Sequence, residues 1–306
     1  MFRAFSFAAV LAAFALAVLG SWVRINGAGM TCPDWPLCNG HLIPTFEGGV
    51  ILEWSHRLVA FIEGFLVIGA IVTGWQARKR IAYIRPALAF IGVVFALQVF
   101  LGAATVALSN NPPSVAWHWA IAMLFLGALT TLAILAIAQP PVTTARKPQS
   151  GLYGVLAGTV VAAFIATCAG AFVSASGAGL ACPSFPACGD SVAGFSSAQA
   201  AQMFHRLVAL VFFGFATIAA YWAALATTDR VRIATLIGYA LVVLQILLGI
   251  ANIAWALPVS LREAHAANAG AAFLAFVAAC VFATLDGTVR ESVATRHSVV
   301  TQTSSS

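Results

Sequence analysis

Residues 20–38 read GSWVRINGAGMTCPDWPLC, and residues 170–188 read GAFVSASGAGLACPSFPAC. The two stretches align without a gap at an offset of 150 residues, with two cysteines, two prolines and a Gly-Ala-Gly in register. A match at fixed spacing indicates an internal duplication. The repeat continues through His-Arg-Leu-Val-Ala at 56–60 and 205–209, and then through Gln98 with Gln245, Gly102 with Gly249 and His118 with His265.

The composition assigns both halves to a membrane. Of the 306 residues, 61% are hydrophobic and only 8% are charged, whereas soluble domains have about 25% charged residues. A soluble globular protein is therefore excluded. Because a bilayer span needs about 20 apolar residues, we predict an all-α integral membrane protein with eight transmembrane helices. The spans are expected at about 4–24, 56–77, 86–108, 115–138, 152–175, 205–227, 233–256 and 263–285.

Each half has an even number of helices, so the second half enters the membrane in the same orientation as the first. We predict two tandem four-helix bundles related by a pseudo-two-fold axis along the membrane normal. The expected domains are an N-terminal half (1–138), a cytoplasmic linker (139–151), a C-terminal half (152–288) and a cytoplasmic tail (289–306). The tail is short and polar, and we expect it to be disordered.

Basic residues are distributed unevenly between the two sides of the membrane. Eleven fall on the side that carries both termini, and four fall on the other side: Arg24, Arg57, Arg206 and Arg262. The positive-inside rule predicts a multi-pass protein of the cell membrane with cytoplasmic termini and external cysteine loops. The net charge of +6 then reflects topology, and we expect no nucleic-acid partner. A cleavable signal peptide is the alternative for the first segment, but the repeat requires that segment as a helix.

Four histidines begin the even-numbered spans on the external side and therefore share one membrane depth. A single histidine in an apolar helix is more often a packed, hydrogen-bonded residue, but four at equivalent positions favour ligation. Imidazole binds haem iron, whereas a zinc or copper site needs further ligands beside each pair, of which the spans offer few. We predict two bis-histidine haem sites, His56 with His118 and His205 with His265.

Arg57 and Arg206 directly follow the first histidine of each pair. The guanidinium group forks onto carboxylates, so we predict that both arginines contact haem propionates. The alternative is an interfacial arginine whose head group reaches water.

The two halves differ in their acidic residues. Glu53 precedes His56 by three residues, whereas Gln202 precedes His205 by the same distance. If the helix extends back this far, Glu53 lies on the same face as His56, and we predict it as the catalytic base or charge stabiliser. The alternative is an N-terminal acid favoured by the helix dipole.

A second acid, Glu63, follows His56 by seven residues and has Phe212 as its counterpart. An acid inside the membrane suggests function, but a protonated or paired structural acid is the alternative. The sequence leaves its role open.

Six cysteines fall into two groups. Cys32 with Cys38 and Cys182 with Cys188 occupy equivalent external loops, where an oxidising compartment favours disulfides. These bridges either staple the loops or exchange electrons with a partner. The remaining two, Cys168 and Cys280, lie inside spans and are expected to be small packed residues.

Taken together, these motifs resemble the bacterial haem A synthase family, in its form with two cysteine pairs. The resemblance rests on Glu-Trp-Ser-His-Arg at 53–57, on the cysteine loop at 32–38, on its repeat at 182–188 and on the four histidines. It covers essentially all eight spans. It implies oxidation of the C8 methyl group of haem O to a formyl group by two hydroxylations, the second giving a gem-diol that loses water. The product is haem A for terminal oxidases.

The resemblance also implies ligand assignments. It makes His205 and His265 the ligands of a haem b cofactor, and His56 and His118 the ligands that hold the substrate haem O near Glu53. An iron with two histidine ligands has no open position, so either a ligand leaves during turnover or the oxidation proceeds by electron removal.

Two other functions remain open at this stage. One is a two-haem membrane cytochrome b that transfers electrons from quinol, and the other is a haem exporter or chaperone. The sequence also leaves open a contact with haem O synthase, a membrane or thiol electron-transfer partner, and a homo-oligomer.

Overall fold

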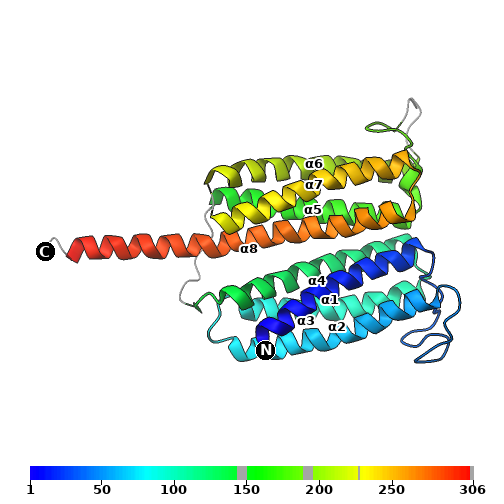
Figure 1. The fold of residues 1–306 in the computed structure, drawn as a ribbon, viewed down its shortest axis with the longest axis horizontal. Helices are drawn as coiled ribbons and strands as arrows, with labels where there is room; N and C mark the ends of the chain where they lie inside the picture. Colours follow the sequence, from blue (N-terminus) through cyan, green and yellow to red (C-terminus); the bar gives the residue numbers. More distant parts are fainter. Residues whose placement is uncertain (143–149, 189–195, 227, 304–306) are drawn as a thin grey trace.

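The computed structural model describes residues 1–142, 150–188, 196–226 and 228–303, which form eight long α-helices and one short 3₁₀ helix (Figure 1). All eight predicted spans are confirmed as helices long and apolar enough to cross a membrane, so the chain is an all-α integral membrane protein. The elements are α1 (Phe2–Ile25), α2 (Val50–Ala77), α3 (Ile84–Ala107), α4 (Pro112–Ala138), α5 (Ser150–Ala175), η2 (Ala178–Leu180), α6 (Ser197–Ala226), α7 (Asp229–Ala254) and α8 (Val259–Thr303).

Three helix ends lie more than four residues from the expected positions. α2 begins at Val50 and α6 at Ser197, so Glu53 and Gln202, whose side chains bond to the cysteine loops, lie within these helices. α8 continues to Thr303, through most of the tail that was expected to be disordered. The unfavourable step in helix formation is nucleation, and a helix that already exists extends residue by residue without it. A polar composition therefore does not prevent α8 from continuing. The tail residues 304–306 and the linker residues 143–149 lie outside the described ranges.

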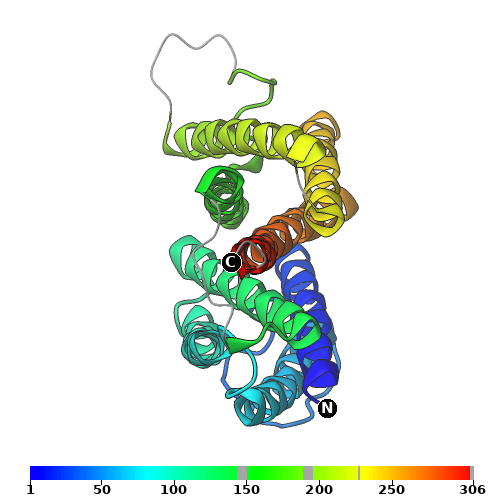
Figure 2. The same cartoon turned by 90° about the vertical axis from the view of Figure 1, so that its left-hand side faces the viewer.

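The same helix pairs form in both halves. α1–α2, α3–α4, α1–α4 and α2–α3 in the first half correspond to α5–α6, α7–α8, α5–α8 and α6–α7 in the second. Between the halves, α4 contacts α5 and α8, and α1 contacts α8 (Figure 2). The apolar window of α4 is 67% buried, compared with 17% for α3 and α7. The structure is therefore a duplicated bundle with α4 at its centre.

One contact marks the axis that relates the halves. Arg24 and Ser174 are equivalent at the repeat offset, and the Arg24 guanidinium donates to the Ser174 carbonyl oxygen at 3.1 Å and to its hydroxyl. Equivalent residues of two repeats meet only near their symmetry axis. Because α1 and α5 run in the same direction, this axis runs along the helices (Figure 1).

Both termini lie at one end of the bundle, and the loop 26–49 lies at the other (Figure 1). This arrangement matches the predicted topology in its relative sides. The assignment of those sides to cytoplasm and exterior stays a prediction.

Candidate active site

One cavity of about 1470 Å³ extends through both halves. Sites for a single small ligand typically occupy about 300–1,000 Å³, so this space accommodates more than one large group. Its lining is mostly apolar, which suits the face of a porphyrin. All four histidines singled out from the sequence line it: His56, His118, His205 and His265.

Each of these histidines packs against a glycine on a neighbouring helix. In two pairs, an added Cβ on the glycine would lie 2.8–2.9 Å from Cε1 of the imidazole, and in the other two it would lie 3.3–3.4 Å away. Glycine therefore lets each ring lie against the adjacent helix backbone. The closer pairs are Gly20 with His56 and Gly170 with His205, and the other two are Gly102 with His118 and Gly249 with His265.

The structure brings the histidines together in the two predicted pairs. His56 on α2 and His118 on α4 line the cavity in the N-terminal half, and His205 on α6 and His265 on α8 line it in the C-terminal half. Nδ1 of His205 hydrogen-bonds to the Ala166 carbonyl oxygen at 3.1 Å. Such a bond leaves Nε2 for a metal and orients the ring.

The donor set fits haem iron better than a free metal ion. Among the described residues, no group of three or more His, Cys, Asp or Glu side chains is arranged to hold an ion. This disfavours the zinc and copper alternative, which needs more than two protein ligands. An apolar cavity with one histidine pair in each half suits two bis-histidine haems.

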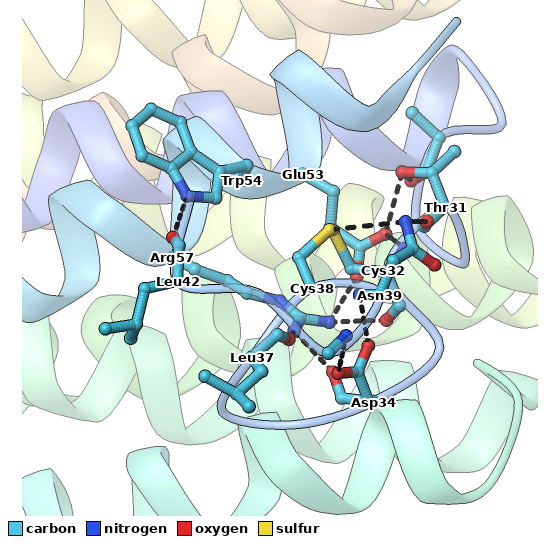
Figure 3. Close-up of a disulfide and its surroundings, with 12 residues drawn as sticks. Thr31, Cys32, Asp34, Leu37, Cys38, Asn39, Leu42, Glu53, Trp54 and Arg57 are labelled. Carbon is cyan, nitrogen blue, oxygen red and sulfur yellow. Dashed lines mark hydrogen bonds and ion pairs between the residues drawn. A yellow bond between two sulfur atoms is a disulfide. The ribbon is translucent and has the colours of Figure 1, made fainter. Parts of the chain in front are cut away.

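Arg57 holds the first cysteine loop in place (Figure 3). Nη1 donates to the carbonyl oxygens of Asp34, at 2.5 Å, and of Leu37, while Nη2 donates to the Cys32 carbonyl oxygen at 2.6 Å and to Glu53 Oε1 at 2.7 Å. Both terminal nitrogens are therefore engaged by the loop and by Glu53.

Arg206 performs the same function in the second half. Nη1 donates to the carbonyl oxygens of Ser184, Pro186 and Ala187 at 2.7–3.0 Å, and Nη2 donates to that of Cys182 at 2.9 Å. The shared role of the two arginines is a clamp on the loops. Their predicted contact with propionates stays a prediction.

Glu53 lies in the first turn of α2, 4% exposed, and lines the cavity. Its Oε2 accepts hydrogen bonds from the Cys32 backbone N–H at 2.9 Å and from the Thr31 hydroxyl at 3.0 Å (Figure 3). With the ion pair to Arg57, the carboxylate accepts bonds from three groups. The conditional prediction that the helix reaches back to Glu53 is confirmed.

Gln202 occupies the equivalent place in α6. Its Oε1 accepts a hydrogen bond from the Cys182 backbone N–H at 2.6 Å, and its Nε2 donates to the Gly179 carbonyl oxygen at 2.8 Å. A neutral side chain therefore ties down the second loop at the position where Glu53 ties down the first.

Both predicted disulfides are present. The Cα atoms of Cys32 and Cys38 are 4.5 Å apart, and those of Cys182 and Cys188 are 4.4 Å apart, as disulfide geometry requires. All four cysteines are buried, which favours the stapling role.

Of the two segments closed by the disulfides, 32–38 and 182–188, only the first contains an acid. Asp34 accepts hydrogen bonds from the backbone N–H groups of Asn39 at 2.6 Å and Gly40 at 2.8 Å. These bonds, above all that from Gly40, hold the pKa of the Asp34 carboxyl below its ordinary value. The second loop has Ser184 at this position, and its hydroxyl donates to the Ala187 carbonyl oxygen at 2.9 Å.

The sequence did not single out two further residues of this cavity, Arg24 and Arg262. All four arginines that the positive-inside rule assigns to the external side line the cavity. The sequence did contain a signal for them, because all four of these arginines lie on the side of the membrane that has few basic residues. That signal applies to Arg24 and Arg262 as much as to Arg57 and Arg206, which each follow a histidine.

Three remaining residues lie where the spans predicted them. Glu63 is in α2 and lines the cavity. The free cysteines Cys168 and Cys280 lie in α5 and α8 and are partly buried.

Comparison with known proteins identifies the family. A family model described as cytochrome oxidase assembly protein, COX15-CtaA, matches residues 3–50 and 45–277. The chain is 32% identical to the heme A synthase of Bacillus licheniformis over 81% of this chain and 84% of that protein. It is 29% identical to that of Bacillus pumilus, over 67% and 69%, and 32% identical to that of Alkalihalophilus pseudofirmus, over 66% and 70%. The chain belongs to the COX15-CtaA family of cytochrome oxidase assembly proteins.

Proposed function

We propose that this chain is a haem A synthase that oxidises the C8 methyl group of haem O to a formyl group by successive hydroxylations. Family membership and the names of the relatives support an enzyme of haem A biosynthesis. The observation that carries the proposal is the cavity itself. It contains two equivalent histidine pairs, but among the described residues that line it, the carboxyl groups, Glu53 and Glu63, both belong to the N-terminal half.

The proposed ligands divide between the halves. His56 and His118 hold the substrate haem O, and His205 and His265 hold haem b. Bound haem b supplies electron-transfer chemistry. The support for this division is the asymmetry of the cavity lining, because Glu53 lines it near His56 and a carboxyl group can accept a proton, whereas the equivalent lining residue of the other half is Gln202.

Glu53 contributes a carboxyl group at the rim of the substrate site. A carboxylate has about four acceptor positions, and three are used by Arg57, Thr31 and Cys32. The remaining position is available to take a proton from an attacking water. The ionised carboxylate also stabilises positive charge that develops on the methyl carbon during oxidation.

The cavity arginines bind the propionates in this proposal. Arg57 and Arg206 were the first candidates, but their terminal nitrogens donate to the loops. Arg24 and Arg262 lie on the same external side and line the same cavity. They join the candidates because guanidinium groups suit carboxylates, and the terminal nitrogens of Arg24, which donate to Ser174, hold no cysteine loop.

The reaction also defines the partners. Each hydroxylation removes a pair of electrons, so a membrane or thiol electron-transfer partner has to accept them, and haem O synthase supplies the substrate. The proposed topology has cytoplasmic termini and external cysteine loops, as the arginine distribution predicts.

Haem analysis of the purified full chain tests the function. We expect haem b together with haem O, its hydroxylated form or haem A, and conversion of added haem O to haem A in membranes. A two-haem cytochrome b would contain haem b alone, and a haem exporter would release haem of unchanged mass. Either result, without conversion of haem O, would contradict the proposal.

A further inference from the structure

A second layer of side chains lines the cavity on the inner side of the histidines. Each member follows a histidine by seven residues, which corresponds to about 10 Å along an α-helix. The layer has two residues in each half. One residue of each half is a phenylalanine, and the second residue of the N-terminal half is a glutamate. The members are Glu63 after His56, Phe125 after His118, Phe212 after His205 and Ala272 after His265.

Glu63 is the polar exception in this layer. Its side chain is 1% exposed and lines the cavity, and neither carboxyl oxygen has a hydrogen-bond partner in the described part of the chain. Buried polar groups normally have partners. In the other half, the equivalent Phe212 packs edge to face on Phe276 at 5.8 Å, so an apolar contact fills that position. An acid without a protein partner, facing a ligand cavity, indicates a polar group on the ligand.

The cavity also extends further inward in the N-terminal half. Beyond Glu63 its lining continues on α2 to Phe65 and Ile68 and includes Phe95 on α3. In the described part of α6 the lining ends at Phe213. Phe65 and Ile68 are 61% and 55% exposed, and α2 contacts α3 less extensively than α6 contacts α7. An apolar path therefore leads from Glu63 to the lipid between α2 and α3.

We infer that Glu63 binds the hydroxyl group of haem O and that the isoprenoid chain of haem O leaves the cavity between α2 and α3. The inference rests on the proposed function. Haem O differs from haem b in carrying, instead of one vinyl group, a long isoprenoid chain with a hydroxyl at its base. A carboxyl group hydrogen-bonds to a hydroxyl in either protonation state. Phe212 offers no such partner, which suits the vinyl group of haem b.

The expected orientation agrees with the charges of the cavity. The propionates of the porphyrin lie on the edge opposite the isoprenoid substituent. Propionates at the external arginines Arg24 and Arg262 therefore direct the hydroxyl toward the inner layer, where Glu63 lies. The same orientation leaves the C8 methyl group, which neighbours a propionate, on the side of Glu53.

A haem-binding titration tests this role without measuring activity. The full chain, purified with its retained haem b, is titrated with haem O or with haem b, and binding of the second haem is followed by absorbance. We expect the parent to prefer haem O. Glu63→Leu should weaken haem O binding about tenfold or more, because a hydrogen bond to a carboxyl group is lost, and should leave haem b binding at this site unchanged. Phe212→Leu is the matched control and should leave the preference for haem O unchanged.

The outcomes separate this inference from the proposed function. If the parent does not bind haem O, the proposed function fails. If Glu63→Leu keeps the parent's preference, or loses both haems equally, Glu63 does not recognise the hydroxyl and the inference is overturned. Should Glu63→Leu fail to fold, Glu63→Met decides, because methionine has a similar length and no carboxyl or amide group. A selective loss of haem O affinity supports the inference, and an unchanged preference overturns it.

Discussion

The N-terminal and C-terminal halves share a scaffold but differ in side chains that line the cavity and the cysteine loops. Both have the histidine pair, the adjoining glycines, the disulfide and the arginine clamp. The differences concentrate on groups that carry charge or hydrogen bonds near the cavity and the loop. Three of the substituted pairs are Glu53 with Gln202, Glu63 with Phe212 and Asp34 with Ser184.

The first of these pairs is the most informative. Glu53 and Gln202 both accept a hydrogen bond from the backbone N–H of the first cysteine in their loop. The loop of the second half is held without a negative charge at this point. The charge of Glu53 is therefore not required for holding the loop, and a chemical role explains it better than a structural one.

Replacing a histidine ligand should reveal the largest functional difference between the halves. His265→Ala should remove the retained haem b almost completely, because the iron loses one of its two ligands. His118→Ala should leave most of the haem b and abolish formation of haem A. The absorbance of the purified variants measures the first effect, and chromatography of extracted haems measures the second. Equal loss of haem b from both variants would refute the division of roles.

Glu53→Gln should have the next largest effect. The variant copies the residue at position 202, so it retains an acceptor for the Cys32 N–H while it removes the charge and the ability to take a proton. A base or charge stabiliser contributes about 10²- to 10⁴-fold in rate, and we expect a loss of this size in haem A formation with haem b retained.

The reciprocal variant Gln202→Glu is the matched control for this experiment. It adds a carboxylate to the haem b half and should leave haem A formation near the parent rate. Formation of haem A by Glu53→Gln at the parent rate would show that Glu53 is a helix-terminal acid without a chemical role.

The sequence was sufficient for the architecture, because the signals that specify it are local or repeated. Apolar runs located the eight spans, and the repeat matched His56 with His205 and His118 with His265 across the halves, at offsets of 149 and 147 residues. The cysteine pairing followed from two close cysteines in each loop.

The contacts of the arginines could not be predicted in the same way. Arg57 follows His56 in sequence, but its guanidinium lies among loop carbonyls that are 20–25 residues away in the chain. A loop's path determines which carbonyl oxygens face an arginine, and spacing along the chain does not specify that path. The open path beside Glu63 was equally hidden, since it depends on how closely α2 and α3 pack.

Substitution of the glycines beside the histidines should have a graded effect. Gly170→Ala would place a Cβ 2.9 Å from Cε1 of His205, whereas Gly249→Ala would place one 3.3 Å from Cε1 of His265. A ring that moves away from the new methyl group no longer points its nitrogen at the iron. We expect about tenfold weaker haem b binding for Gly170→Ala and a smaller loss for Gly249→Ala.

Haem b retained on purification measures this effect, and Gly20→Ala serves as the control. Its Cβ would lie 2.8 Å from His56, so it should disturb the N-terminal site and leave haem b in place. Loss of haem b from Gly20→Ala to the same extent as from Gly170→Ala would mean that the two sites are not separable.

The smallest effect is expected in the cysteine loops, where the first half has Asp34 and the second half has Ser184 at the equivalent position. Hydrogen bonds to its charged form hold the pKa of Asp34 below its ordinary value, which is about 3.9. Its carboxylate therefore stabilises the first loop fully above that ordinary pKa, and this contribution is lost as the pH falls through the lower pKa of the folded state.

Hydrogen exchange should show the Asn39 and Gly40 amides losing protection at acidic pH, after correction for intrinsic rates. Asp34→Asn should abolish this pH dependence, and the loop at 182–188, which has a serine at the equivalent position, should lack it in the parent. Protection of both amides that stays constant down to pH 2 would show that the carboxylate does not hold this turn.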